Sequence, residues 1–381
     1  MLLGLDLGTG SVKAILIHPD RTVAGVGARS YAVRSPRPGW AESNPEEWWS
    51  AVGEAARKAI GPHGPGVAAV GLSGQMHGVV PARASGEPLR PAILWADARS
   101  ADHLHAYRAL DEGARLRLAN PPTVGMAGPS LLWLRDNEPK TYENIRWALQ
   151  PKDWLRLRLT AEAATEPSDA SATLLYDLPA DRWDHGLAET LGLRTDFLAP
   201  VIASAASGGL TREAAEHLGL RAGLPVAAGA ADTAAAMLGT GLSKPGLVQL
   251  TIGTGAQIVA PTHHPDPDPH GRTHLYRAAA PGLFYSMAAI QNAGLALEWA
   301  RGVLGVSWEE VYEEAFTVPA GAEGLAFLPY LSGERTPHLD PEARGAWTGL
   351  GLGHGRGHLL RAALEGVAFA LREGLEALEM A

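Results

Sequence analysis

Short apolar runs open the chain, and each is followed by a polar or glycine-rich turn. Residues 2–7, 12–17 and 23–31 therefore predict three consecutive strands. Asn44 precedes a proline and two glutamates, which is typical of a capped helix start, so a helix is expected over residues 44–60. Strand and helix patterns alternate through the rest of the chain. Strands joined by helical crossovers predict an α/β protein.

The remaining elements are predicted from the same patterns. We expect strands at 67–72, 224–228, 247–260 and 283–286, a hairpin over 81–91, and helices within 101–118 and at 130–137, 153–159, 211–220, 233–238, 292–304, 308–316 and 358–380. Because 381 residues exceed one ordinary hydrophobic core, two domains are expected, residues 1–243 and 244–381. No strand pattern follows the last helix, so we expect the second domain to be incomplete.

Composition excludes several classes of protein. The net charge is −9, and no cluster of Lys or Arg offers a footprint for nucleic acid. The chain has no cysteine, which excludes disulfides, thiolate zinc sites and a cysteine nucleophile. An acid at position 6 comes too early for a secretory leader, and Asp232 interrupts the most apolar later window, so no membrane span is expected. We therefore expect a cytoplasmic protein, and a homodimer is one assembly that the sequence leaves open.

Two distant segments share one short pattern. Residues 5–10 read Leu-Asp-Leu-Gly-Thr-Gly and residues 250–255 read Leu-Thr-Ile-Gly-Thr-Gly, each between two apolar runs. This predicts a strand, a tight turn with glycines at positive φ, and a returning strand. The open backbone N–H groups of such a turn suit phosphate oxygens, although a plain hairpin turn reads the same way. Two copies favour a duplicated domain that holds a polyphosphate between its halves.

Asp6 lies inside the first apolar run, just before its glycine turn. A carboxylate there would repel phosphates unless a divalent cation lay between them, so a Mg²⁺ ligand is the natural interpretation. The alternative is an aspartate that merely starts a turn, which is common. Lys13 follows within reach of a bound phosphate, and a surface lysine on a strand is equally compatible with its position.

Asp232 ends a buried apolar stretch and begins a helix. That position is the carboxyl edge of a strand, where ligand crevices of α/β proteins form, and also a helix N-terminus, which should keep the carboxylate ionised. An ionised aspartate could accept the proton of a hydroxyl that attacks a γ-phosphoryl group. The local sequence alone favours the alternative, in which Asp232 is simply the N-cap of the helix.

Three further polar segments are candidates for ligand contacts. Residues 73–78, Ser-Gly-Gln-Met-His-Gly, follow a buried strand and could contact a polyol, although a loop histidine is more often structural. Trp95, Asp97 and Arg99 alternate on a predicted strand and would share one face, where the charged pair suits sugar hydroxyls or forms a surface ion pair. Histidines and prolines at 263–270 resemble a metal-binding tract, but a solvated surface loop is favoured.

Together these phrases resemble the FGGY family of carbohydrate kinases. The resemblance rests on residues 6–11, 74–78, 95–99 and 332–338 in that order, and on Gly349-Leu350, His358-Leu359 and residues 362–365 further along. It covers the chain from residue 1 to about 380. Within the family, Gln-Met-His-Gly looks like the phrase of the members that phosphorylate xylulose.

The resemblance implies two actin/ribonuclease-H-like domains and transfer of the γ-phosphoryl group of MgATP to the terminal hydroxyl of D-xylulose. It makes Asp232 the base, gives Asp6 to Mg²⁺ and the phosphates, and places the small-molecule sugar and ATP between the domains. The implied substrate-side residues are Gln75, Met76, His77, Trp95, Asp97, Arg99 and Thr233. The implied nucleotide-side residues are Gly8, Thr9, Gly10, Ser11, Lys13, Gly253, Thr254 and Gly255.

The chain departs from the family at several positions. Ala96 and Thr233 stand where asparagine is frequent, and Ser130 stands where lysine is usual. Family members carry a further C-terminal segment with a glycine-rich loop for adenosine, and this chain ends before that loop. We therefore expect one of three situations: a truncated product, another chain that supplies the missing segment, or loss of nucleotide binding. The alternatives are a kinase for ribulose, gluconate or glycerol, and a non-catalytic relic that still binds sugar. An actin-like or chaperone ATPase is a weaker alternative, because it has no use for residues 73–78 and 95–99.

Overall fold

The computed structural model describes residues 1–379 and divides the chain into two compact units. The first unit consists of Met1–Leu118, Pro122–Ser243 and Tyr276–Leu283. The second consists of Ala119–Pro121, Lys244–Leu275 and Phe284–Ala381. The main division thus falls between Ser243 and Lys244, and one short segment on each side of it belongs to the other unit.

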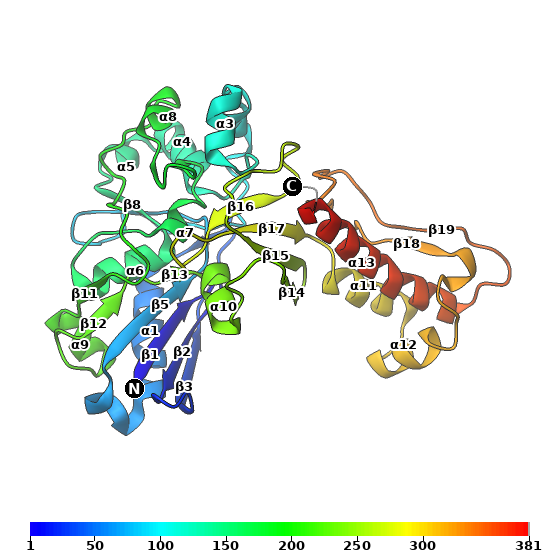
Figure 1. The fold of residues 1–381 in the computed structure, drawn as a ribbon, viewed down its shortest axis with the longest axis horizontal. Helices are drawn as coiled ribbons and strands as arrows, with labels where there is room; N and C mark the ends of the chain where they lie inside the picture. Colours follow the sequence, from blue (N-terminus) through cyan, green and yellow to red (C-terminus); the bar gives the residue numbers. More distant parts are fainter. Residues whose placement is uncertain (380–381) are drawn as a thin grey trace. The chain divides into compact units, whose positions relative to one another are not determined.

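A seven-stranded mixed sheet forms the centre of the first unit (Figure 1). Its path runs β11-β12-β5-β1-β2-β3, and β13 also pairs with β5. β1 to β3 form an antiparallel meander, β1, β12 and β13 run parallel to β5, and β11 is antiparallel to β12. The bounds are β1 (Leu2–Leu7), β2 (Ser11–Ile17), β3 (Val23–Ser30), β5 (Ala69–Gly74), β11 (Ser207–Gly209), β12 (Pro225–Ala227) and β13 (Ala230–Ala231).

One face of this sheet is covered by helix α1 (Pro45–Ile60). Leu3, Leu5 and Leu7 point into that core and are at most 1% exposed. Glycines at 25 and 27 allow the close approach, since a Cβ at either position would lie 2.1 Å from a carbonyl oxygen of α1. Because side chains alternate along a strand, the intervening residues of β1 and β2, such as Asp6 and Lys13, face the other side of the sheet.

Smaller elements complete the first unit (Figure 1). Its helices are η1 (Gly61–Gly66), η2 (Ala101–His103), α2 (Leu104–Arg108), α3 (Glu112–Leu118), α4 (Ala127–Asn137), α5 (Pro139–Glu143), α6 (Pro151–Thr160), α7 (Pro167–Ala170), α8 (His185–Thr190), α9 (Arg212–Leu218) and α10 (Asp232–Thr240). Its short strands are β4 (Glu42–Ser43), β6 (Val80–Ala82), β7 (Ala92–Ile93), β8 (Trp147–Leu149), β9 (Tyr176–Asp177) and β10 (Arg182–Trp183).

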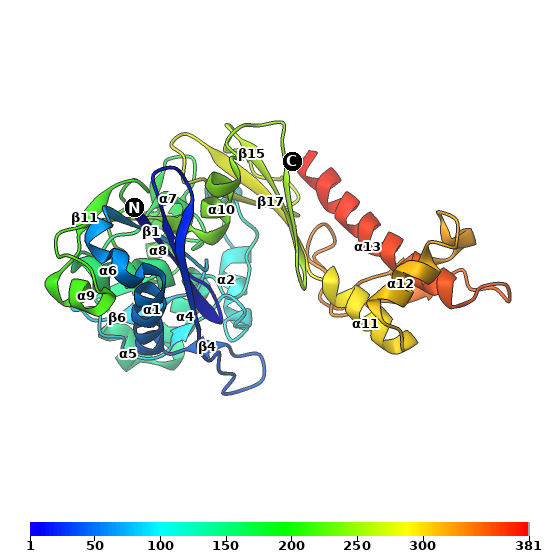
Figure 2. The same cartoon turned by 90° about the horizontal axis from the view of Figure 1, so that it is seen from below.

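The second unit is built on β14, β15 and β17 of a four-stranded sheet in the order β14-β15-β17-β16, and the last two residues of β16 are assigned to the first unit. Helix α13 packs against β15 and β17 and is flanked by α11 and α12 (Figure 2). Small and branched residues such as Ala256, Ile258 and Ala363 form the core. The bounds are β14 (Gln249–Ile252), β15 (Ala256–Thr262), β16 (His274–Arg277), β17 (Phe284–Ile290), β18 (Ala326–Leu328), β19 (Ala346–Thr348), α11 (Gly294–Leu304), α12 (Trp308–Ala315), η3 (Ala322–Gly324) and α13 (Arg356–Glu379).

Most predicted elements lie within a few residues of the observed ones, but the segment after β7 differs. Trp95, Asp97 and Arg99 do not lie on a strand, because β7 ends at Ile93 and the following residues form turns. The prediction of a shared strand face was therefore wrong. The helix predicted over 101–118 is divided into η2, α2 and α3. The predicted end of the last helix at Met380 lies outside the described residues.

Candidate active site

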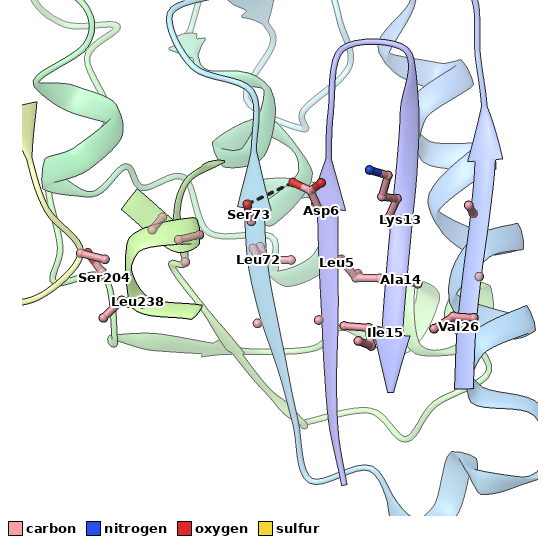
Figure 3. Close-up of a pocket in the computed structure, with 18 of the residues that line it drawn as sticks. Leu5, Asp6, Lys13, Ala14, Ile15, Val26, Leu72, Ser73, Ser204 and Leu238 are labelled. Carbon is pink, nitrogen blue, oxygen red and sulfur yellow. Dashed lines mark hydrogen bonds between the residues drawn. The ribbon is translucent and has the colours of Figure 1, made fainter. Parts of the chain in front are cut away.

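Three polar side chains form a row across the open face of the first unit's sheet. Asp6 of β1 is directly paired with Ser73 of β5 on one side and with Lys13 of β2 on the other. Ser73 Oγ donates a hydrogen bond to Asp6 Oδ1 at 3.1 Å, and the three side chains share one face (Figure 3). The strand pairing therefore places a carboxylate, a hydroxyl and an ammonium group side by side.

Asp232 directly follows β13, the short strand that pairs with β5 in the same sheet. Ala230 pairs with Ser73 and Ala231 pairs with Gly74, so the chain leaves the sheet at Asp232 and enters α10. Because β13 is two strands from β1, the backbones of Asp6 and Asp232 lie roughly 10 Å apart. The sheet thus brings together two carboxylates that are far apart in the sequence.

Asp232 is not the N-cap of α10, which the local sequence favoured. The cap position is occupied by Ala231, and Asp232 is the first helical residue. Its Oδ1 accepts the backbone N–H of Thr233 at 2.6 Å and lies 3.3 Å from the Thr233 hydroxyl. Thr233 itself is buried, and its hydroxyl is directed to the Asp232 carboxylate. Oδ2 has no such bond to any residue between 1 and 379.

The surroundings of Asp232 favour its neutral form more than an ordinary aspartate site does. Asp232 reaches solvent, but dense protein surrounds its carboxylate on most sides, and this desolvation raises its pKa to about 6. The Thr233 N–H lowers the pKa, while the negative charge of Asp6 raises it further. The expected contribution of the helix N-terminus to keeping this carboxylate ionised stays a prediction. A pKa near 6 still leaves roughly nine-tenths of the groups ionised at pH 7.

A large hollow lies against the open face of the sheet (Figure 3). Its volume is about 940 Å³, and it contains Asp6, Lys13, Ser73 and Ser204 among mostly apolar residues. The polar row lies toward one end of the strands, whereas Ile15 and Val26 lie farther along (Figure 3). The first unit therefore offers a concave surface whose polar groups are concentrated around Asp6.

The first glycine turn is fixed by side chains from three other segments. Tyr31 Oη and Gln75 Nε2 both donate to the Gly8 carbonyl, the latter at 3.2 Å, and Trp95 Nε1 donates to Thr9 Oγ1 at 2.9 Å. The Gly8 N–H donates to the Ser11 carbonyl at 3.0 Å. Within the described chain, the N–H groups of Thr9 and Gly10 donate to no residue. The turn therefore keeps donors that a phosphate could use.

The second glycine turn belongs to the second unit and joins β14 to β15. Gly253 donates its N–H to the Gly255 carbonyl at 2.8 Å, and the Thr254 carbonyl accepts the N–H of Leu295 near the start of α11. No glycine of either turn has a positive φ, so the predicted left-handed turn geometry was wrong. Close packing explains Gly255 instead, since a Cβ there would lie 2.6 Å from the Ile290 carbonyl oxygen.

The Gln-Met-His segment follows β5 directly. Gln75 and Met76 are buried, and Gln75 donates its N–H to the Leu7 carbonyl at 2.9 Å, which ties this segment to the first glycine turn. His77 has a φ of 73°, a conformation that costs a non-glycine residue roughly 1–3 kcal/mol and is frequent at ligand sites. Its Nδ1 lies 3.0 Å from the Ala172 carbonyl oxygen, and its ring lies 5.8 Å from that of Tyr276.

Asp97 and Arg99 form a buried ion pair. Arg99 Nη2 lies 2.7 Å from Asp97 Oδ2 and also 2.7 Å from Glu42 Oε1, and both side chains are 1% exposed. Asp97 Oδ2 also accepts the Ala41 N–H, and the Arg99 guanidinium lies over the Trp40 ring. These contacts hold the loop that carries Trp95, which is 38% exposed. Most of the pair's hydrogen-bonding capacity is used within the protein.

The donor set around Asp6 fits a hard divalent cation. Within residues 1–379 no cluster of three or more His, Cys, Asp or Glu side chains could hold a metal by itself. Mg²⁺ does not need one, because it is commonly held by one or two carboxylates together with phosphate oxygens and water. Asp6 and the neighbouring Asp232 match this pattern, whereas the histidines at 263–270 lie in an irregular segment. No helix in this range is long and apolar enough to cross a membrane.

Several residues around these carboxylates were not singled out from the sequence. They are Tyr31, Lys152, Glu166, Ser168 and Ser204, and all belong to the first unit. Tyr31 contacts the first glycine turn, and burial together with the charge of Asp6 raises the pKa of its hydroxyl. A tyrosine at the end of a predicted strand carries no signal of this role. The four polar residues among residues 165–169 are a weak signal that sequence reasoning passed over.

Comparison with known proteins identifies the family to which both halves of the chain are similar. The profile described as the FGGY family of carbohydrate kinases, N-terminal domain, matches residues 1–239, and that of the C-terminal domain matches residues 248–381. The chain is 36% identical over 380 residues to xylulose kinase of Escherichia coli (strain K12), and this match covers 99% of the chain and 78% of that protein.

Two solved structures show the same arrangement of elements. Xylulose kinase from Rhodospirillum rubrum has a TM-score of 0.93 at 33% identity, and gluconate kinase from Lactobacillus acidophilus has a TM-score of 0.94 at 25% identity. Each match covers 99% of this chain and 78% of the other.

Proposed function

The chain belongs to the FGGY family of carbohydrate kinases, and we propose that it transfers the γ-phosphoryl group of ATP to D-xylulose, giving D-xylulose 5-phosphate. The similarity to xylulose kinase of Escherichia coli over 99% of the chain supports this substrate. The observation that carries the proposal is the Asp232 carboxylate. It lies at the head of α10 with a pKa of about 6, on the same sheet as Asp6 and next to β5, which leads into the Gln-Met-His segment.

Asp232 acts as the general base in this proposal. It is largely ionised at neutral pH, and its Oδ2 is not used by the Thr233 N–H. The carboxylate accepts the proton of the sugar's terminal hydroxyl as the hydroxyl oxygen bonds to the γ-phosphorus and the bond from that phosphorus to the bridging oxygen of ADP breaks. A base whose pKa lies near the working pH combines a high ionised fraction with adequate basicity.

Asp6 and the first glycine turn serve the phosphates. Mg²⁺, when bound with ATP, supplies positive charge that neutralises the phosphate oxygens, and Asp6 would hold it. Lys13 neighbours Asp6 across the strands and adds a second positive charge. The N–H groups of Thr9 and Gly10 provide neutral donors, with Gly8 and Ser11 setting the turn. Gly253, Thr254 and Gly255 of the second unit are proposed to face the nucleotide in the same way.

The sugar side of the site is assigned to the segment after β5. Met76 and His77 provide an apolar surface and a ring donor or acceptor, and the left-handed backbone of His77 fixes their direction. Gln75 and Trp95 hold the first glycine turn, and Thr233 holds the base. A direct contact of these three residues with the sugar stays a prediction. Asp97 and Arg99 stabilise the loop that carries Trp95, and a direct contact between that pair and the sugar stays a prediction.

The test measures ADP release from ATP with D-xylulose and Mg²⁺, alongside sugar binding by calorimetry. Asp232→Asn should bind D-xylulose as tightly as the unmodified chain and release ADP at least a hundredfold more slowly. Sugar binding without nucleotide binding in the unmodified chain would select the non-catalytic relic. Omitting Mg²⁺ and adding EDTA tests whether ADP release requires the cation. Size-exclusion chromatography tests whether the chain forms a homodimer.

Gluconate is a second candidate substrate. The structure of gluconate kinase from Lactobacillus acidophilus has the same fold at 25% identity, which is lower than the 36% identity to a xylulose kinase. A panel of D-xylulose, ribulose, gluconate and glycerol at equal concentration therefore discriminates between the two. A larger kcat/KM for gluconate than for D-xylulose would replace the proposed substrate while keeping the reaction.

A further inference from the structure

A cluster of charged side chains is buried behind the candidate active site. Lys152, at the start of α6, is completely inaccessible, and so are Glu166 and Asp169. Its Nζ lies 2.5 Å from Asp153 Oδ1, 3.2 Å from Asp169 Oδ2 and 3.8 Å from Glu166 Oε1. One ammonium group therefore faces three carboxyl groups in the interior of the first unit. Such an arrangement is costly to bury, which favours a role beyond general stability.

The same lysine holds the chain that leads to Asp232. Its Nζ donates to the Ala228 carbonyl at 3.1 Å. The neighbouring residues are held from the other side, because the Ala228 N–H donates to the Ala206 carbonyl and the Gly229 N–H donates to the Ser204 carbonyl. Residues 228 and 229 connect β12 to β13, so these bonds fix the segment just before the base.

A second branch of the cluster reaches the residue next to Asp232. Glu166 accepts bonds from the Ser168 N–H, the Asp169 N–H and the hydroxyls of Ser168 and Ser204. Ser168 Oγ in turn accepts the Ala231 N–H at 2.9 Å. Ala231 is completely buried and is the N-cap of α10. Its methyl side chain makes no capping hydrogen bond. The hydroxyl of Ser168 is therefore the direct connection between the charged cluster and the head of α10.

We propose that Lys152, Glu166 and Ser168 are positioning residues that hold backbone 228–231 and thereby direct the Asp232 carboxylate toward the acceptor hydroxyl. The inference rests on the proposed role of Asp232 as the base. Lys152, Glu166 and Ser168 are completely buried, so we assign them no contact with substrate or nucleotide. Their effect reaches the reaction through the backbone, because a shift of about 1 Å at a base lowers the rate of proton transfer strongly.

Ser168→Ala is the decisive variant, because it removes the bond to Ala231 without changing any charge. Ser171→Ala is its matched control. Ser171 is also a buried serine, three residues along, and its Oγ accepts a backbone N–H at 3.0 Å, but that N–H belongs to Arg277. Each variant loses two hydrogen bonds of a buried serine hydroxyl: Ser168→Ala those to the Ala231 N–H and Glu166, and Ser171→Ala those to the Arg277 N–H and the Ser168 carbonyl. Only Ser168→Ala removes a bond to the segment before Asp232. Lys152→Met is a second variant, which removes the bond to the Ala228 carbonyl. It is more severe, because it also removes the ammonium group that faces three carboxyl groups.

Two measurements on the full chain test the proposal. Hydrogen exchange of the peptide covering 226–232 should be at least tenfold faster in Ser168→Ala than in Ser171→Ala. The kcat of Ser168→Ala for D-xylulose should fall about tenfold with KM within about twofold, whereas kcat of Ser171→Ala should stay within about twofold of the unmodified chain.

The outcomes separate this inference from the proposed function. Unchanged exchange at 226–232 in Ser168→Ala overturns the inference, and so does faster exchange with an unchanged kcat. A fall in kcat that both serine variants share also overturns it, because that result reflects general destabilisation. If the unmodified chain releases no ADP with any sugar, the proposed function fails, and hydrogen exchange alone then decides whether the cluster holds residues 228–231.

Discussion

At the scale of single residues, opposing influences act on the Asp232 carboxylate. The Thr233 N–H and the helix N-terminus stabilise the anion, whereas desolvation and the charge of Asp6 destabilise it. The balance raises its pKa to about 6, compared with 3.8 for an ordinary aspartate. Desolvation is the largest of these influences, and the hydrogen bonds from Thr233 offset only part of it.

This pKa predicts the pH dependence of the reaction. The base must be ionised to accept a proton, so kcat/KM for D-xylulose should fall about tenfold per pH unit below pH 6 and be nearly constant above pH 7. Initial rates between pH 4.5 and 8.5, with folding monitored by circular dichroism, check this. An acid limb centred near pH 4 would show that Asp232 titrates as an ordinary aspartate.

Asp232→Asn should separate activity from stability. A carboxyl group whose pKa is raised on folding prefers to be protonated in the folded state, so its ionisation opposes folding increasingly as the pH rises from about 4 through about 6. Asparagine cannot ionise, and after discounting for solvent screening the variant should be about 1 kcal/mol more stable at pH 7.5. Urea unfolding at pH 7.5 and at pH 4 measures this gain.

The gain in stability should disappear at pH 4, where the unmodified carboxyl group is protonated. An equal gain at both pH values would mean that asparagine improves packing and that charge is not the cause. Activity of the variant should be lost at every pH, because no other described carboxylate occupies the head of α10.

The sequence predicted the identity of the candidate residues better than their surroundings. Asp6 was identified because it lies inside an apolar run and Asp232 because it ends one, and local patterning reveals both positions. Whether Asp232 caps the helix depends on where α10 begins. The pKa of Asp232 depends on β1 and β5, which lie far away in the sequence. Lys152 looked like an ordinary charged residue of a helix, because burial by distant segments leaves no local signal.

At the scale of elements, the connection between β12 and β13 determines where the base lies. The strand predicted over 224–228 corresponds to β12, which ends at Ala227, and after an interruption at residues 228 and 229 a second short strand, β13, begins at Ala230. Gly229 lies between them with a φ of 81°, and a Cβ there would lie 2.1 Å from the Leu72 carbonyl oxygen. Both the left-handed backbone and the close approach to β5 require glycine at this position.

Gly229→Ala should therefore be strongly destabilising. The backbone strain and the clash with β5 together should lower the free energy of unfolding by about 3 kcal/mol or more, and the displaced segment should also lower kcat. Gly223→Ala is a matched control, since Gly223 has a φ of 79° but an added Cβ would meet no atom within 4 Å. That control should cost only about 1–2 kcal/mol.

Urea unfolding of both variants measures the difference. Equal losses would show that the left-handed backbone alone accounts for the effect and that β5 can move away from residue 229. Propensity and patterning located β12 within a few residues, but the interruption arises from packing against β5. Short-range patterns do not contain that contact, which is also why the segment over 95–99 was wrongly predicted as a strand.

At the scale of the whole molecule, the predicted family and the α/β fold with two actin/ribonuclease-H-like domains are confirmed by the family profiles and the solved structures. The repeated Gly-Thr-Gly phrase indicated the duplication, because one copy falls in each unit. Asp6, Met76, His77 and Asp232 all belong to the first unit, whereas Gly253 to Gly255 belong to the second. The residues proposed to bind the sugar therefore all belong to the first unit.

This distribution predicts how the sugar stabilises the protein. If D-xylulose binds the folded first unit, a concentration one hundred times its Kd should add about 2.7 kcal/mol to the free energy of unfolding, without nucleotide. His77→Ala should lose most of this gain, because His77 is assigned to the sugar, and Asp232→Asn should keep it. His105→Ala, an exposed histidine of α2, is the control that should behave as the unmodified chain. Thermal unfolding across a series of sugar concentrations measures the gain, and an undiminished gain in His77→Ala would remove that residue from the sugar site.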